Sequence, residues 1–134
     1  MMDDVPSIPG ADALAVWFGS WPSFHDAEIH ELHLDRQRVS WLKIHTWRMT
    51  DRVDDKGYYV LEKHVMVTFS LKGVTTLVLD DFSHQNVISE LVIEQVRDGL
   101  VMTLEPCYGL SGMIEAKEMS IEFTPIAPSW GSFA

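Results

Sequence analysis

The side chains with the most chemical potential gather between His25 and Asp35, where eleven residues hold three histidines and four carboxylates. Histidine and carboxylate are the ligands that zinc and similar ions use in proteins. An extended strand would place Glu28 and His30 on one face and Glu31 on the other. Alternating polar residues on an exposed strand are more often a solvated face than an ion site. We therefore keep metal or small-ligand binding by this cluster as an alternative function.

Nucleophilic catalysis would need an activated serine or cysteine, a base within hydrogen-bonding reach and an acid to orient that base. Ser20, Ser23 and His25 are close in the sequence, but no glycine-framed nucleophile elbow surrounds either serine. Cys107 is expected to be a small buried or half-buried side chain, without a helix N-terminus nearby to activate its thiol. The sequence shows no convincing catalytic site, so we expect a protein that is not an enzyme and needs no cofactor.

Two tryptophans on one predicted strand are candidates for contacts with a partner. Residues 39–48 alternate, which places Leu42 and Ile44 on one face and Trp41 and Trp47 on the other. Tryptophan is enriched at protein–protein hot spots because it buries a large area at a small entropic cost. If Leu42 and Ile44 face the core, the tryptophan face is open to a partner unless the helix or the tail covers it.

The elements that position these side chains begin with a short helix predicted over residues 11–18, where apolar residues recur at helical spacing. Asp12 or the stretch 7–9 could begin this helix, and Gly19 ends it. The next stretch, residues 20–26, has no periodicity and is too apolar for an ordinary surface loop. We expect it to pack on the body of the domain.

From residue 27 almost to the end, apolar residues recur with the period of two that is typical of strands. The pattern predicts seven strands, over residues 27–34, 39–48, 58–71, 74–80, 90–96, 100–105 and 113–124. A tight turn is predicted at Lys72–Gly73, a hairpin at Asp98-Gly99, and a bulge between Ile29 and Leu32. The expected fold is α+β and β-dominated: an antiparallel meander of about seven strands, open, curled or partly closed, with one short N-terminal helix.

Length and composition exclude several classes of protein. A single cysteine cannot form a disulfide scaffold or a zinc finger built on paired cysteines. The acidic N-terminus lacks the features of a secretory signal, and no apolar run approaches the roughly 18 residues of a membrane span. We expect one cytoplasmic domain over residues 1–134 that does not bind membranes. It would comprise a helix with an irregular segment over 1–26, a sheet over 27–124 and a tail over 125–134.

The net charge of −10 is distributed in three segments. Residues 1–37 carry seven acids and one base, residues 38–76 four acids and seven bases, and residues 77–134 nine acids and two bases. Charges that only solvate the outer faces of strands would give such a pattern, but it also suits a cationic protein partner better than nucleic acid. The candidate partner-binding residues are Asp26, Glu28, Glu31, Trp41, Trp47, Asp80 and Asp81.

The stretch from Phe18 to Glu28, FGSWPSFHDAE, resembles the signature of the immunity protein 50 family. The strand that follows to Arg36, the segment 82–88 and the Gly109–Gly112 turn are similar in kind, so the resemblance covers most of the chain. These small bacterial proteins are thought to be encoded beside polymorphic toxin genes and to neutralise the toxin by binding it. The resemblance therefore implies a toxin as protein partner, no catalysis and no obligatory cofactor.

The residues of this motif also have a structural interpretation. Trp21 and Phe24 are expected in the core, and Pro22 fixes the approach of the chain. His25 and Asp26 stand at a strand entrance, where they can hydrogen-bond backbone groups that the irregular stretch leaves unpaired.

The function favoured by these observations is binding to a protein partner, such as a basic toxin domain, with electrostatic attraction speeding the encounter. Two other functions stay open. The first is a small metal- or ligand-binding β protein that uses the His25–Asp35 cluster. The second is a self-assembling protein, a homo-oligomer in which an open edge strand pairs with a second copy.

Overall fold

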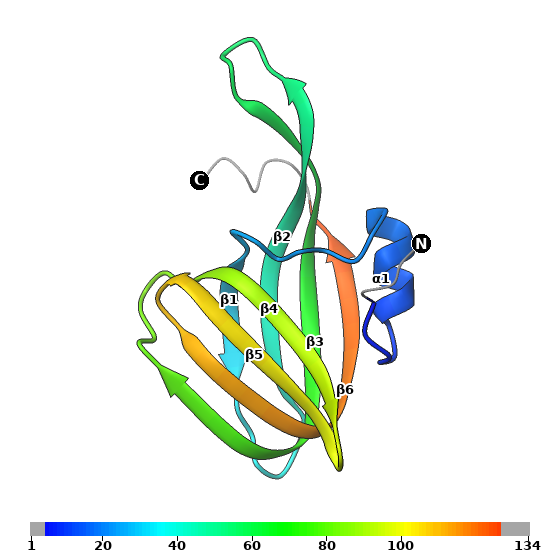
Figure 1. The fold of residues 1–134 in the computed structure, drawn as a ribbon, viewed down its shortest axis with the longest axis vertical. Helices are drawn as coiled ribbons and strands as arrows, with labels where there is room; N and C mark the ends of the chain where they lie inside the picture. The colour runs from blue at the N-terminus through cyan, green and yellow to red at the C-terminus, as the bar shows by residue number, and fades with distance from the viewer. Residues whose placement is uncertain (1–4, 127–134) are drawn as a thin grey trace.

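The computed structural model describes residues 5–126, which form one helix and a barrel of six strands (Figure 1). The elements are α1 (Ala11–Phe18), β1 (Glu28–His33), β2 (Ser40–Val53), β3 (Tyr59–Asp80), β4 (Val87–Val96), β5 (Gly99–Tyr108) and β6 (Ser111–Pro125). Every strand pair is antiparallel, and the order β1-β2-β3-β6-β5-β4 closes on itself. The predicted β-dominated α+β fold is confirmed, and among its possible forms the sheet is a closed barrel. The predicted tail lies outside the described residues from residue 127 on.

The barrel consists of two three-stranded meanders, β1-β2-β3 and β4-β5-β6, joined along two seams. One seam is long, because β3 pairs with β6 from Val65 opposite Pro125 to Asp80 opposite Ser111. The other seam, between β1 and β4, is short, with Glu28 opposite Val87. The backbone around Ile88 extends this short seam through 2.8 Å hydrogen bonds to residues 26 and 27. The motif after the helix is thereby held against β4.

The sheet has six strands because β3 does not end at the predicted turn. Lys72–Gly73 lies inside a strand of 22 residues, so the prediction of a turn there is wrong. Gly73 adopts a φ of +66°, and pairing with β6 continues on both sides of it, with a bulge after Val74. A glycine at a bend within a strand and a glycine at a turn between two strands can have the same local sequence. Only the pairing with a neighbouring strand shows which of the two has formed.

Helix α1 covers part of the barrel beside β6 (Figure 1). Its buried face consists of Ala11, Leu14, Ala15 and Phe18. The helix begins after Gly10, which makes no side-chain cap, and not through Asp12 or the 7–9 stretch as predicted. A side chain at Gly10 would overlap the backbone oxygen of Ile121. The residue before the helix must therefore be glycine for the chain to lie this close to β6. Within residues 5–126 no helix has the length and apolar character needed to cross a membrane.

Strands β2 and β3 extend beyond the barrel as a two-stranded hairpin, which we call the arm and define as residues 48–62 (Figure 1). Its turn is organised by Asp54, whose carboxylate accepts hydrogen bonds from the backbone N–H of Lys56 (2.9 Å) and Tyr58 (3.0 Å). Strand β2 continues to Val53, so only residues 54–58 at the tip of the arm lie outside the two strands.

Candidate partner-binding site

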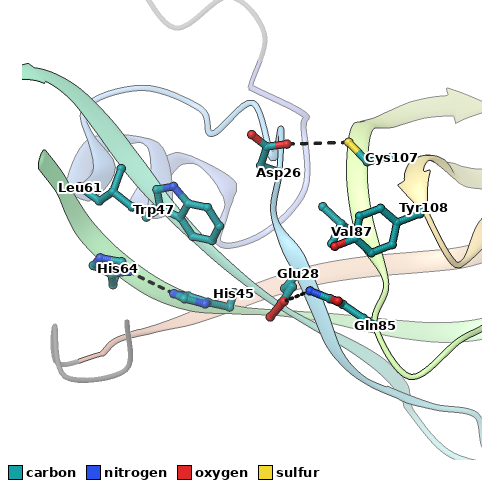
Figure 2. A pocket seen from close by; sticks show the side chains of 10 residues that line it. All are labelled: Asp26, Glu28, His45, Trp47, Leu61, His64, Gln85, Val87, Cys107 and Tyr108. Carbon is teal, nitrogen blue, oxygen red and sulfur yellow. Dashed lines mark hydrogen bonds between the residues drawn. The ribbon is translucent and has the colours of Figure 1, made fainter. Parts of the chain in front are cut away.

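A pocket of about 500 Å³ lies where the arm meets the short β1–β4 seam (Figure 2). Its walls come from β1, β2, β3, the start of β4 and the end of β5, so five strands contribute to it. The lining residues are Asp26, Glu28, His45, Trp47, Leu61, His64, Gln85, Val87, Cys107 and Tyr108. This volume falls within the range of roughly 300–1,000 Å³ that is usual for binding sites.

Two histidines from neighbouring strands form one side of the pocket. Nε2 of His45 lies 3.2 Å from Nδ1 of His64, and their rings stack with centroids 5.4 Å apart. Burial, and after it the nearby His64 and His30, lower the pKa of His45 to about 4, against the raising effect of Glu28. Burial also lowers the pKa of His64. Both rings are therefore neutral at pH 7, and one donates its N–H to the unprotonated nitrogen of the other.

Two carboxylates lie beside the histidines, on the segment that enters β1. Glu28 accepts a hydrogen bond from Nε2 of Gln85 at 3.4 Å, and its other oxygen lies 3.9 Å from Nε2 of His30. Asp26 lies 3.6 Å from Nε2 of His25. Within residues 5–126 neither carboxylate forms an ion pair with lysine or arginine. The pocket therefore carries negative charge without a strong cation of its own.

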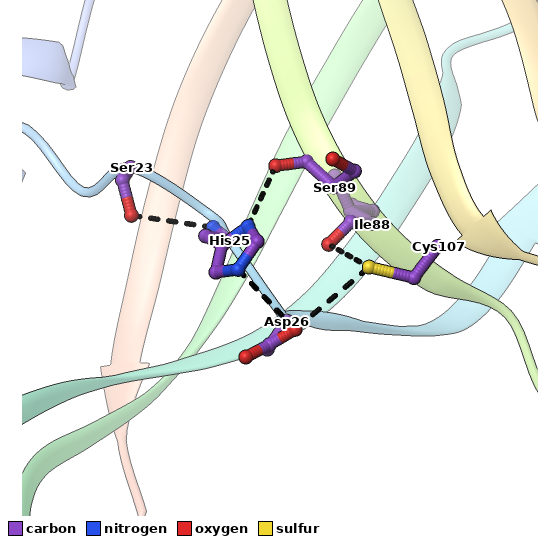
Figure 3. A network of polar contacts seen from close by, with 6 residues as sticks. All are labelled: Ser23, His25, Asp26, Ile88, Ser89 and Cys107. Atoms are coloured by element: carbon purple, nitrogen blue, oxygen red, sulfur yellow. Dashed lines mark hydrogen bonds and ion pairs between the residues drawn. The ribbon is translucent and has the colours of Figure 1, made fainter.

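The motif that precedes β1 fixes Asp26 in place (Figure 3). Asp26 has a φ of +66°, and its backbone N–H donates to the oxygen of Ile88 at 2.8 Å. The Nδ1 atom of His25 lies 3.1 Å from the backbone oxygen of Ser89. Phe24, only 1% exposed, anchors the segment in the core. The motif thus ties an irregular stretch to β4 through backbone groups.

The aromatic and proline residues of the motif pack behind Phe24. Trp21 meets the Phe24 ring edge-on at 5.6 Å, and Phe69 of β3 lies 5.8 Å away on another side. Pro22 is buried and Trp21 is half-buried against the core. This packing gives the strand entrance a rigid base.

Cys107 is exposed near the end of β5, so the expectation of a buried or half-buried thiol is wrong. Its Sγ lies 3.8 Å from a carboxylate oxygen of Asp26 and 3.7 Å from the backbone oxygen of Ile88 (Figure 3). Both neighbours are acceptors, so the thiol is placed to donate, and neither of them is a histidine. The arrangement does not resemble an activated nucleophile.

The three histidines of the His25–Asp35 cluster lie in different surroundings. His25 binds the backbone of Ser89, while His30 stands near Glu28 and His45. The third, His33, stacks on Trp41 with ring centroids 3.9 Å apart. Within the part of the chain that the structure describes, no group of three or more His, Cys, Asp or Glu residues could hold a metal ion. The bulge after Ile29 and the alternation of β1 separate ligands that are neighbours in the sequence.

The arm presents an apolar surface that continues into the pocket. Met49 lies opposite Leu61 and Val53 opposite Tyr59, and the strand period places all four on one side. These side chains, which we call the apolar face of the arm, are 40–59% exposed. The other side carries the ion pair between Arg52 and Glu62 at 2.9 Å. Because Leu61 also lines the pocket, the two surfaces are continuous.

Comparison with known protein families shows to which family the chain belongs. The family model described as Immunity protein 50 matches residues 10–125, most of the chain. The chain belongs to the immunity protein 50 family. No curated protein and no solved structure matches it. Membership in an immunity family suggests a non-enzymatic role and a protein partner.

In this immunity protein 50 chain, the residues predicted to contact a partner divide among three places. Asp26, Glu28 and Trp47 line the pocket. Trp41 instead donates its indole N–H to the Glu31 carboxylate and stacks on His33, on the outer side of the β1–β2 pair. The exposed Asp80 and Asp81 stand where β3 ends and do not line the pocket. The structure thus brings together three of the seven.

Sequence reasoning did not find several residues of the site in this family member. Leu61 and His64 of β3, and Val87 and Tyr108 of β4 and β5, were not singled out. Their role depends on which strands pair, and β1 pairs with β4 only because the barrel closes. The Tyr58-Tyr59 pair after a polar turn was a usable signal, since two large aromatics beside charged residues are unusual in a solvated hairpin.

Proposed function

We propose that this chain neutralises a bacterial toxin by binding it directly, with the arm and the adjoining pocket as the binding surface. The apolar face of the arm is the observation that carries this proposal. Four large apolar side chains lie together on a projecting hairpin and are 40–59% exposed, while the barrel buries its own core. A contiguous exposed apolar surface of this kind is typical of a protein–protein site.

The polar groups of the pocket support binding and not catalysis. His45 and His64 bond each other, and the nearest side-chain contact of Cys107 is with a carboxylate and not with either histidine. A toxin held on this surface would have its own substrate site occluded by the arm and the barrel end. Family membership supports the same function, because it suggests a protein partner.

Co-expression with the product of the neighbouring gene tests the proposal, in the cytoplasm, where we propose that the protein acts. The wild-type chain is expected to restore growth that the toxin inhibits. The double variant Tyr59→Ser/Leu61→Ser, which removes half of the apolar face, is expected to lose this protection while keeping its circular dichroism spectrum. A matched control, Val78→Ser/Phe82→Ser, removes two exposed apolar side chains elsewhere and should still protect.

Two outcomes would contradict the proposal. Absence of protection by the wild-type chain, with both proteins detected by immunoblot, would remove the toxin-neutralising function. Protection by the Tyr59→Ser/Leu61→Ser variant equal to that of wild type would remove the arm from the binding surface.

Small-ligand binding is a second candidate function, favoured by the volume of the pocket alone. It predicts that the untagged protein carries a small molecule through purification, visible by native mass spectrometry. The substitution Trp47→Ala should release this molecule. Detection of only the bare chain under native conditions would argue against it.

A further inference from the structure

We propose that the pocket receives one cationic side chain, a lysine or arginine, of the bound toxin. The inference rests on the proposed function and names the group of the partner that the site recognises. The neighbouring apolar face of the arm would hold the surrounding surface of the toxin.

The charge of the pocket is the first argument. Asp26 and Glu28 carry the negative charge, and Gln85 is the amide that reaches Glu28, at 3.4 Å. The residues described by the structure supply no lysine or arginine to either carboxylate. His45, which is buried, and His64, which is half-buried, are neutral at pH 7 because desolvation lowers their pKa values, so they do not offset this charge. A cation from outside is the group that completes the site.

The walls of the pocket are the second argument. Trp47 and Tyr108 face the cavity from opposite sides, with the carboxylates between them (Figure 2). Aromatic faces attract ammonium and guanidinium groups, and most strongly where water is excluded. The alkyl stem of a lysine or arginine can pack against Leu61 and Val87, which also line the cavity. An apolar side chain would desolvate the carboxylates without pairing them, and an anionic one would be repelled.

The fixed backbone of Asp26 is the third argument. Asp26 sits in the left-handed region at φ +66°, a conformation that aspartate tolerates better than most residues. Its backbone is held by Ile88, and the preceding Phe24 is locked in the core. The backbone that carries the carboxylate is therefore fixed beside the pocket before any partner arrives, which lowers the entropic cost of pairing Asp26 with a cation.

Binding of the purified full chain to a catalytically inactive form of the neighbouring gene product tests the inference. The double variant Asp26→Asn/Glu28→Gln removes both pocket charges but keeps shape and hydrogen bonding. The matched control, Glu94→Gln/Glu118→Gln, removes two exposed charges from β4 and β6 away from the pocket. By calorimetry in physiological salt, we expect the dissociation constant of the pocket variant to rise on the order of 100-fold and that of the control less than about threefold.

A double-mutant cycle identifies the toxin side chain. Each lysine and arginine of the toxin is changed to methionine and measured against wild type and the pocket variant. One position is expected to show a large loss that disappears when the pocket charges are already absent. Equal losses for the pocket and control variants, or no coupled toxin position, would overturn the inference while leaving neutralisation intact. No binding by the wild-type chain would overturn the proposed function and the inference together.

Discussion

At the scale of single residues, the contact between the buried His45 and the half-buried His64 links the stability of the barrel to pH. His45 is 5% exposed, and burial, with His64 and His30, lowers its pKa to about 4 against the raising effect of Glu28. In the unfolded chain the same ring titrates near its ordinary value of 6.5. The unfolded state therefore binds a proton more readily, and the free energy of unfolding falls as pH drops from about 6.5 toward 4.

We expect His45 to reduce the free energy of unfolding by about 2 kcal/mol between pH 7 and pH 5. The variant His45→Gln should lose this part of the pH dependence, leaving the smaller effect of His64, whose pKa is lowered in the same direction. Urea unfolding at a series of pH values measures this pH dependence of the free energy of unfolding. His84→Gln, at an exposed position, is the control and should follow wild type. A pH profile of His45→Gln that matches wild type would contradict the assignment.

Phe24 connects the family motif to the core, and its truncation should be costly. The ring is 1% exposed and packs against Trp21 and Phe69. Phe24→Ala is expected to lower the free energy of unfolding by about 3–5 kcal/mol, because it removes buried surface and leaves a cavity. Phe82→Ala, at a position that is 70% exposed, should change it by less than about 0.5 kcal/mol. Chemical denaturation of both variants measures these changes. Similar losses of unfolding free energy in the two variants would refute the prediction.

At the scale of elements, the sequence predicted correctly those features that depend on residues close together in the chain. The helix has the predicted bounds, Ala11–Phe18, because its apolar spacing and Gly19 are contained in one short stretch. The hairpin at Asp98-Gly99 and the bulge after Ile29 were predicted for the same reason and are confirmed. The prediction of a turn at Lys72–Gly73 was wrong, because β6 pairs with β3 on both sides of Gly73 and keeps β3 continuous. Long-range pairing overrides a local turn preference.

Gly112 is a point of close approach between β6 and β3, and it gives a test of the long seam. Its φ is +144°, and a Cβ there would overlap the backbone oxygen of Val78 on β3. Gly112→Ala is expected to cost about 3 kcal/mol, because one strand must move away from the other. Gly57→Ala at the arm tip meets open space and should cost only about 1 kcal/mol of backbone strain. Equal losses in thermal or urea unfolding would show that the seam tolerates a side chain.

At the scale of the whole molecule, the net charge of −10 acts over distances longer than any contact. The acidic first and last segments enclose a mildly basic middle that includes the arm. A cationic partner would be attracted by the whole field and then held by the pocket and the apolar face of the arm. Barrel closure joins β1 to β4 only over the short seam, and self-assembly through an open strand edge is still a prediction.

We expect the association rate constant with a cationic toxin to fall about tenfold or more between roughly 10 mM and 150 mM salt, because the Debye length shortens to about 8 Å. The dissociation rate should change far less. Stopped-flow fluorescence of the pocket tryptophan would follow both rates. An association rate that is indifferent to salt would remove electrostatic steering from the mechanism.

The sequence by itself determined the fold class, the helix, the alternation of the strands and the family, because each depends on residues that are near neighbours or on a contiguous motif. It also identified Asp26, Glu28 and Trp47 as binding candidates. Only the tertiary structure decided that the sheet closes, that β3 is continuous, and that His64 and Tyr108 join those three around one pocket. The physical reason is that strand pairing is a long-range choice: it depends on the register of partners up to some sixty residues away, as for Glu28 and Val87.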